Sequence, residues 1–200
     1  MHLLTASFRS ILEKSVILSA LLYYAGWLGA ILGAANGYPK EGATIVFVVI
    51  AIGLIQGGKP EMGFAGLAFL LGAVFEYFLL EMKLVDYPES VQFLEGMRPP
   101  IWMLLLWPLL MRTLAKGQCL AWIKDKTLWS VLFGGFGGGL AYYGGDSLGA
   151  LNFLSPNKVE TAVYIGVGWA IMFPLLVKIR SYMESQMFMA LPKGQKNGDV

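Results

Sequence analysis

Four charged residues stand inside long apolar stretches of this 200-residue sequence: Glu76, Arg112, Lys116 and Asp146. A charged side chain at mid-membrane depth costs at least about 2.5 kcal/mol, so each such residue is a functional hypothesis by default. The residues next to Glu76 read "AVF" before it and "YF" after it, and they offer no local ion-pair partner. We therefore expect Glu76 to point into the protein, either protonated in an apolar site or facing a tyrosine or Asp146.

The set of side chains that could catalyse a reaction is small. His2 is the only histidine and Cys119 the only cysteine, which excludes a histidine-based dyad, a zinc site and a cysteine cluster. An enzyme would have to use Glu76, Asp146 and a tyrosine such as Tyr142 in general acid–base roles. The other interpretation of the tyrosines, which we favour, is an aromatic belt at the membrane interface. We expect no metal site and no cofactor.

Composition predicts a membrane protein. Hydrophobic residues make up 56% of the chain and charged residues 14%, against about 45–50% and about 25% in soluble domains. Between the charged clusters lie six stretches long enough to cross a bilayer core, which takes about 20 helical residues. These are residues 15–38, 42–58, 62–80, 99–123, 127 to about 150, and 161–177. Runs such as "IVFVVIAIGLI" lack the alternation of barrel strands. We expect an all-α, polytopic membrane protein with a bundle of about six transmembrane helices.

The distribution of basic residues predicts an orientation. Of the 15 Lys and Arg, eleven fall on one side of the bundle and four on the other. By the positive-inside rule both termini are cytoplasmic. The domains we expect are an amphipathic cytoplasmic segment at 1–14, a transmembrane domain at 15–180 and a cytoplasmic tail at 181–200. The outward loop at 81–98 is acidic; we favour a solvated loop over a vestibule that attracts cations.

Residues of the fourth stretch are candidates for binding. Arg112 and Lys116 lie near its inner end, and one interpretation makes both of them interfacial anchors. That interpretation suits Lys116 best. Arg112, Trp102 and Trp107 are our candidates for contact with a lipid or a partner membrane protein. Nucleic acid is not an expected partner, because orientation explains the excess of positive charge.

A glycine-rich segment, "FGGFGGGLAYYGGD", occupies residues 133–146. It has no lysine for a phosphate-binding loop, and its aromatic residues do not suit a flexible linker. On a helix its small residues form one stripe that suits close packing between membrane helices. The stripe consists of Gly134, Gly138, Ala141, Gly145 and Gly149. The first stretch repeats the pattern, so we expect the first and fifth helices to pack tightly, against each other or against a second copy.

Four segments of the chain carry a family resemblance: "GWLGAILGAANGYP" at 26–39, "PPIWMLLLWPLLMRTL" at 99–114, "GGGLAYYGGDSLGAL" at 137–151 and "GWAIMFPLL" at 168–176. Together they resemble a family of small bacterial inner-membrane proteins of unknown function, DUF2878. The sequence departs from the family pattern at residues 115–118, where the family tends to carry polar residues. It also has Glu76 where an aspartate would be expected. The resemblance implies a bacterial inner membrane and a link to lipid modification or envelope stress, and it supplies no activity.

The function we expect is therefore that of a non-catalytic inner-membrane protein. It would bind a lipid or a partner membrane protein, or form a homo-oligomer, in lipid or envelope homeostasis. A lipid-modifying membrane enzyme that uses Glu76 and Asp146 with tyrosines is the first alternative. A transporter of a small solute or lipid is the second.

Overall fold

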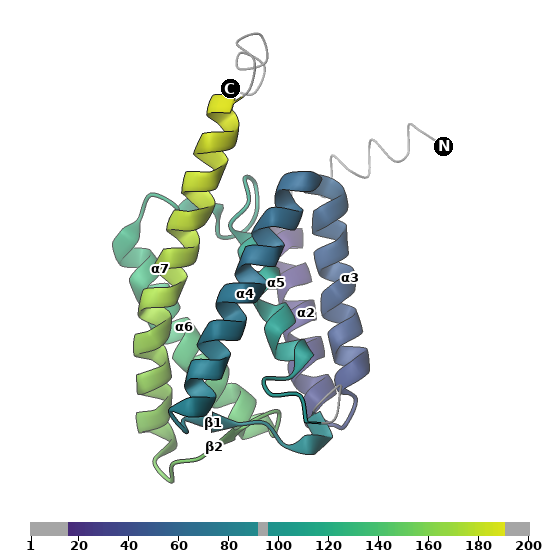
Figure 1. The fold of residues 1–200 in the computed structure, drawn as a ribbon, viewed down its shortest axis with the longest axis vertical. Helices are drawn as coiled ribbons and strands as arrows, with labels where there is room; N and C mark the ends of the chain where they lie inside the picture. The colour runs from purple at the N-terminus through teal and green to yellow at the C-terminus, as the bar shows by residue number, and fades with distance from the viewer. Residues whose placement is uncertain (1–15, 92–95, 191–200) are drawn as a thin grey trace.

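The computed structural model describes residues 16–91 and 96–190, so the expected segment 1–14 and the end of the expected tail lie outside the described residues. Helices dominate this part of the chain, as predicted (Figure 1). They are α2 (Val16–Ala35), α3 (Pro39–Gly57), α4 (Lys59–Glu81), α5 (Ile101–Thr113), α6 (Thr127–Leu148) and α7 (Lys158–Ala190). Two short strands, β1 (Val85–Asp86) and β2 (Asn152–Phe153), pair antiparallel. Two 3-10 turns, η1 (Glu89–Val91) and η2 (Ala121–Ile123), complete the described elements.

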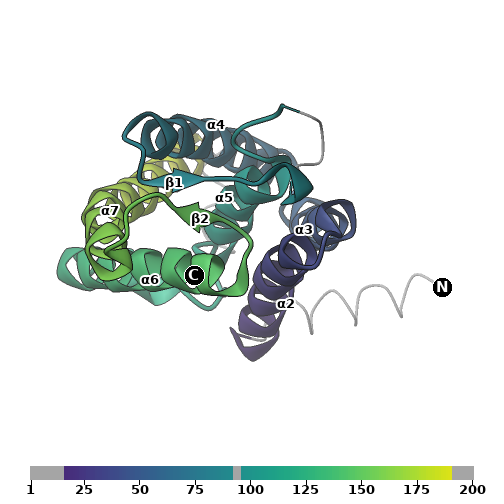
Figure 2. The ribbon, with the colours of Figure 1, turned by 90° about the horizontal axis from the view of Figure 1, so that it is seen from below.

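Successive helices run in opposite directions, so the described chain begins and ends at the same end of the bundle (Figure 1). The hairpin of α2 and α3 lies on one side and that of α6 and α7 on the other. Between them, α5 contacts α2, α3 and α4. Seen from the end that carries the sheet, β1 and β2 run across the space between α4, α6 and α7 (Figure 2).

Four of the helices are long and apolar enough to cross a membrane: α2, α3, α4 and α7. Large apolar side chains on the outer surface fit such a setting, since soluble proteins rarely expose wide apolar patches. Ile55 is 75% exposed, Phe136 71% and Val74 70%. The last helix continues to Ala190, beyond the apolar stretch at 161–177 that the sequence indicated.

The fourth predicted span, 99–123, is wrong in its extent. Its helix, α5, has 13 residues, about 20 Å of length, and is too short to cross a bilayer core on its own. It ends at Thr113 because the chain turns there: the amide of Leu120 donates to the Thr113 carbonyl, and Gly117 adopts a φ of +79° that favours glycine. The amide of Cys119 then donates to Ser19 Oγ at 3.2 Å, which fixes the turn against α2.

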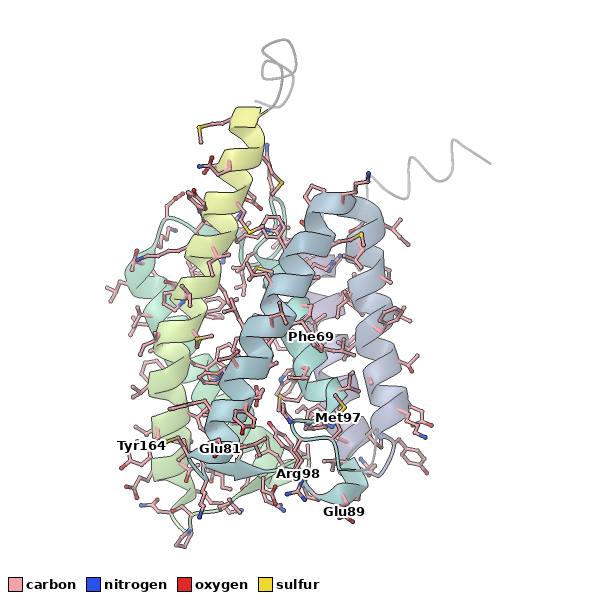
Figure 3. The ribbon with its side chains drawn as sticks, in the orientation of Figure 1. Phe69, Glu81, Glu89, Met97, Arg98 and Tyr164 are labelled. Atoms are coloured by element: carbon pink, nitrogen blue, oxygen red, sulfur yellow. The ribbon has the colours of Figure 1, made fainter. Side chains whose placement is uncertain are left out.

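The loop after α4 packs as a cap over the end of the bundle, and its acidic side chains Glu81 and Glu89 are exposed, as expected of the solvated acidic loop that we favoured. Tyr87 and Val91 are fully buried, and β1 pairs with β2 across the end of the bundle. Arg98 Nη1 donates to Asp86 Oδ1 at 2.9 Å, which neutralises part of the acidic charge. Figure 3 shows Glu81, Glu89 and Arg98 around the rim of this cap. The acidic side chains thus surround a folded segment.

Glycines of α6 lie against α7, and these two helices make the most extensive helix–helix contact in the described part of the chain. A Cβ atom at Gly134 would come within 2.5 Å of the Trp169 carbonyl oxygen, and one at Gly138 would overlap the Trp169 side chain. Gly145 faces Leu151 instead, and Gly149 ends the helix with a φ of +86°. Two glycines of the predicted stripe thus pack against α7, while the other two pack against the following turn or end the helix. The expected pairing of the first and fifth helices with each other is not found, because α2 and α6 touch little.

Replacing Gly138 with leucine should lower the free energy of unfolding by about 1–3 kcal/mol, because the new side chain cannot fit beside Trp169. Gly144→Leu is the matched control: a Cβ atom there meets nothing within 4 Å, so this variant shows only the gain in helix propensity of about 1 kcal/mol. Thermal unfolding in detergent measures both. Equal stability of the two variants would contradict the packing role of Gly138.

Candidate functional site

The carboxyl group of Glu76 lies at the centre of a buried hydrogen-bond network. Its side chain is 0% exposed, on the inner face of α4. Tyr87 Oη donates to Oε2 at 2.8 Å, and Trp107 Nε1 donates to Oε1 at 3.0 Å. Tyr142 Oη donates to Oε1 as well. Three donors, from the cap, α5 and α6, thus satisfy a polar group that would otherwise be costly to bury.

Aromatic rings surround this network. Trp107 stacks on Trp169 of α7, with ring centroids 4.6 Å apart, and Phe75 meets both rings edge-on. Glycines make room for these rings: a Cβ atom at Gly72 would overlap Trp107, and one at Gly168 would lie 2.9 Å from Phe75. The ring of Trp107 is therefore enclosed between Gly72 of α4 and Trp169 of α7.

Tyr87 is a network residue that sequence reasoning missed. It lies in the cap between α4 and α5, and nothing in its local sequence marks it as buried. Burial and the neighbouring Glu76 carboxyl raise the pKa of the Tyr87 hydroxyl well above its ordinary value. The hydroxyl therefore stays protonated and able to donate over the whole physiological pH range. One feature of the sequence could have indicated it: a lone tyrosine in an outward loop near the level expected for Glu76.

Asp146, the second candidate carboxylate, belongs to a different network. Its Oδ1 accepts the backbone amide of Phe153 at 2.8 Å, and its Oδ2 pairs with Lys158 Nζ at 2.7 Å. These contacts fix the turn that carries β2 and the start of α7. Glu76 thus faces tyrosines, one of the two arrangements that the sequence left open, and Asp146 holds the cap in place.

An apolar cavity of about 440 Å³ lies beside the network, between α2, α5, α6 and α7. Its walls include Trp27, Ile31, Leu106, Phe133, Tyr142 and Trp169. Tyr24 and Leu140 also line it and are 59% and 69% exposed, so the cavity opens at the surface between α2 and α6. None of the described residues that line it carries a charge. Its size is within the range of pockets that hold small ligands, about 300–1,000 Å³.

The three residues proposed for lipid or partner contact have different surroundings. Trp102 is fully buried, and its Nε1 donates to the Val91 carbonyl at 2.8 Å, so it secures the cap and does not face the surface. Trp107 lines the apolar cavity while bonding to Glu76. Arg112 lies toward the other end of the bundle, and its Nη2 donates to Gln56 Oε1 at 3.2 Å. Arg112 and Glu76 therefore do not form a pair.

The structure is that of a small helical protein in which aromatic side chains surround one buried carboxyl group. An apolar cavity beside this group opens at the surface between two helices. The chain belongs to a family of proteins of unknown function, DUF2878, whose model matches residues 16–175. This agrees with the resemblance noted in the sequence. Comparison with curated proteins finds no match, and comparison with solved structures finds none either.

Glu76→Gln should keep the fold, with a loss of stability of about 1 kcal/mol. The amide oxygen accepts from Trp107 and Tyr142, and the amide nitrogen donates to Tyr87, whose hydroxyl can accept. Glu76→Leu should cost at least about 3 kcal/mol, because it leaves three buried donors unpaired. Thermal unfolding in detergent compares them.

The control for these variants is Glu81→Leu, which removes an exposed carboxylate from the same helix. Its effect should stay within about 0.5 kcal/mol. If Glu76→Leu were as stable as Glu81→Leu, the carboxyl group would not hold the network together.

Proposed function

We propose that this protein is a non-catalytic, multi-pass protein of the bacterial inner membrane that binds a lipid chain in the cavity between α2 and α6. The observation that carries the proposal is the cavity itself: about 440 Å³, apolar and aromatic, and open where exposed side chains line it. A hydrocarbon chain is the ligand that such a lining favours, since it makes close van der Waals contact with apolar and aromatic side chains and requires no polar partner.

The setting supports a ligand that arrives from the membrane. The opening lies between two helices whose outer surfaces carry apolar side chains, among them Leu21, Phe136 and Leu140. A lipid chain could enter from the side without crossing water. A soluble ligand would have to pass this apolar surface first.

Catalysis has weaker support from the geometry. Glu76 is fully buried, both of its oxygens accept hydrogen bonds, and it does not line the apolar cavity. Asp146 is committed to Lys158 and to the Phe153 amide. A general acid or base must reach the proton that it transfers, and these carboxyl groups are held by structural contacts instead. Lipid binding without chemistry is therefore the function we propose.

The orientation that we propose puts both termini in the cytoplasm. The end of the bundle where α7 finishes carries most of the basic residues, including Lys116, Lys124 and Arg180, and positive charge is retained on the cytoplasmic side. A reporter that works only in the cytoplasm should be active when it is fused at Val200, and one that works only in the periplasm should be inactive. Activity of a periplasmic reporter at that position would reverse the orientation.

Ala141→Phe should displace the bound lipid. Ala141 lines the cavity, and a phenylalanine there fills part of its volume. Mass spectrometry of lipids that copurify with the protein should show at least about a tenfold loss, as expected when an added ring occupies the space of the ligand. Val74→Phe is the control, since Val74 is 70% exposed and does not line the cavity; it should keep the lipid.

Cys119 supplies a second measurement, because it lines the cavity and is the only cysteine in the sequence. Its alkylation by a maleimide should slow when lipid is added to delipidated protein. An unchanged rate, together with equal lipid content in both variants, would refute the proposed function.

A further inference from the structure

A second cavity, of about 340 Å³, lies toward the opposite end of the bundle from the sheet, between α3, α4, α5 and α7. Unlike the first, it is lined by charged and amide side chains. They are Gln56, Glu61, Arg112, Lys116, Gln118, Arg180 and Glu184. Lys116 is exposed, so this cavity also reaches the surface.

The two carboxylates of this cavity are already paired. Both oxygens of Glu61 accept from Arg180, whose guanidinium also lies 3.9 Å from the ring of Phe64. Arg180 Nε donates to Glu184 at 2.7 Å, and Lys124 pairs with Glu184 from the other side. Two cations therefore balance two anions within this part of the cavity wall.

Arg112 makes no ion pair among the described residues, and Glu61, the carboxylate that acts on it electrostatically, already accepts from Arg180 with both oxygens. Arg112 is 7% exposed, and its side chain donates a hydrogen bond to the neutral Gln56. Gly53 makes room for it, since a Cβ atom there would overlap Arg112 Cδ and Nε. A buried charge without a partner is strongly unfavourable. The fold nevertheless provides space for this guanidinium beside an open, polar cavity.

Gln118 points to a ligand independently. It is 9% exposed and lines the same cavity, and its Oε1 has no hydrogen-bond partner among the described residues. Buried side-chain polar atoms in folded proteins are nearly always paired. Because the oxygen and nitrogen of an amide can exchange places by a flip, Gln118 can offer either an acceptor or a donor to a bound group.

We propose that this cavity binds a phosphate group, with Arg112 as its counter-ion and Gln118 as a second hydrogen-bond partner. A guanidinium presents parallel N–H donors that match phosphate oxygens. The phosphate would come from the headgroup of an anionic phospholipid or from free phosphate. The site is separate from the apolar cavity, so the proposal goes beyond the proposed function and does not depend on it.

The test is the melting temperature of delipidated protein in detergent, measured with added phosphatidylglycerol, diacylglycerol or inorganic phosphate. Phosphatidylglycerol should raise it more than diacylglycerol does, because both probes can place a chain in the apolar cavity and only phosphatidylglycerol carries a phosphate. Arg112→Gln should weaken the effect of phosphatidylglycerol at least about tenfold, as expected for lost charge-assisted hydrogen bonds. Arg112→Lys keeps the charge and should retain part of the effect. Arg98→Gln removes the same charge at the other end of the bundle and should behave like the wild type.

Each outcome bears on the proposal. A larger response to phosphatidylglycerol than to diacylglycerol, with none to inorganic phosphate, assigns the phosphate to a lipid headgroup, and a response to inorganic phosphate as well assigns the site to free phosphate. Equal responses of the wild type to phosphatidylglycerol and diacylglycerol, with none to inorganic phosphate, would overturn the proposal, whether or not Arg112→Gln folds. An equal response of Arg112→Gln and the wild type would overturn it too. Gln118→Leu, which leaves Arg112 in place, should weaken binding, and an unchanged affinity would remove Gln118 from the site.

Discussion

The need to satisfy one buried carboxyl group organises this fold. Glu76 accepts hydrogen bonds from Tyr87, Trp107 and Tyr142, and these three residues come from parts of the chain that are far apart in sequence. Each donor would itself be costly to bury without a partner. The carboxyl group therefore joins α4, the cap, α5 and α6 at one point. Because Trp107 and Tyr142 also line the apolar cavity, the shape of that cavity depends on the same contacts.

Glycine has a complementary role beside these aromatic rings. The large rings of Trp107, Trp169 and Phe75 each meet a glycine on a neighbouring helix: Gly72, Gly138 and Gly168 respectively. A bilayer supplies little hydrophobic force between helices, so close packing of small against large surfaces holds them together. Glycine lowers the stability of an isolated helix, and this cost is offset here by contacts that a larger residue would prevent.

The two ends of the bundle differ in chemistry. At the sheet end, Asp86 and Asp146 pair with Arg98 and Lys158 and secure a folded cap. At the other end, Arg180 and Lys124 pair with Glu61 and Glu184, and Arg112 remains beside an open polar cavity. The apolar cavity lies between these ends. A lipid chain and a phosphate group would thus be held by separate parts of the same small protein.

The sequence by itself determined the helical class, the approximate positions of five of the six described α-helices, and the inward orientation of Glu76, because runs of apolar residues and a charge within them are local properties. Tertiary structure decided the rest. Tyr87 and Trp102 reach their partners through the folding of the cap, which no periodicity records. The short α5 depends on a turn closed between Thr113 and Leu120 and anchored on Ser19. Glycine spacing predicted a packing face, but the helix that this face meets, α7 with its Trp169, was decided by the tertiary arrangement.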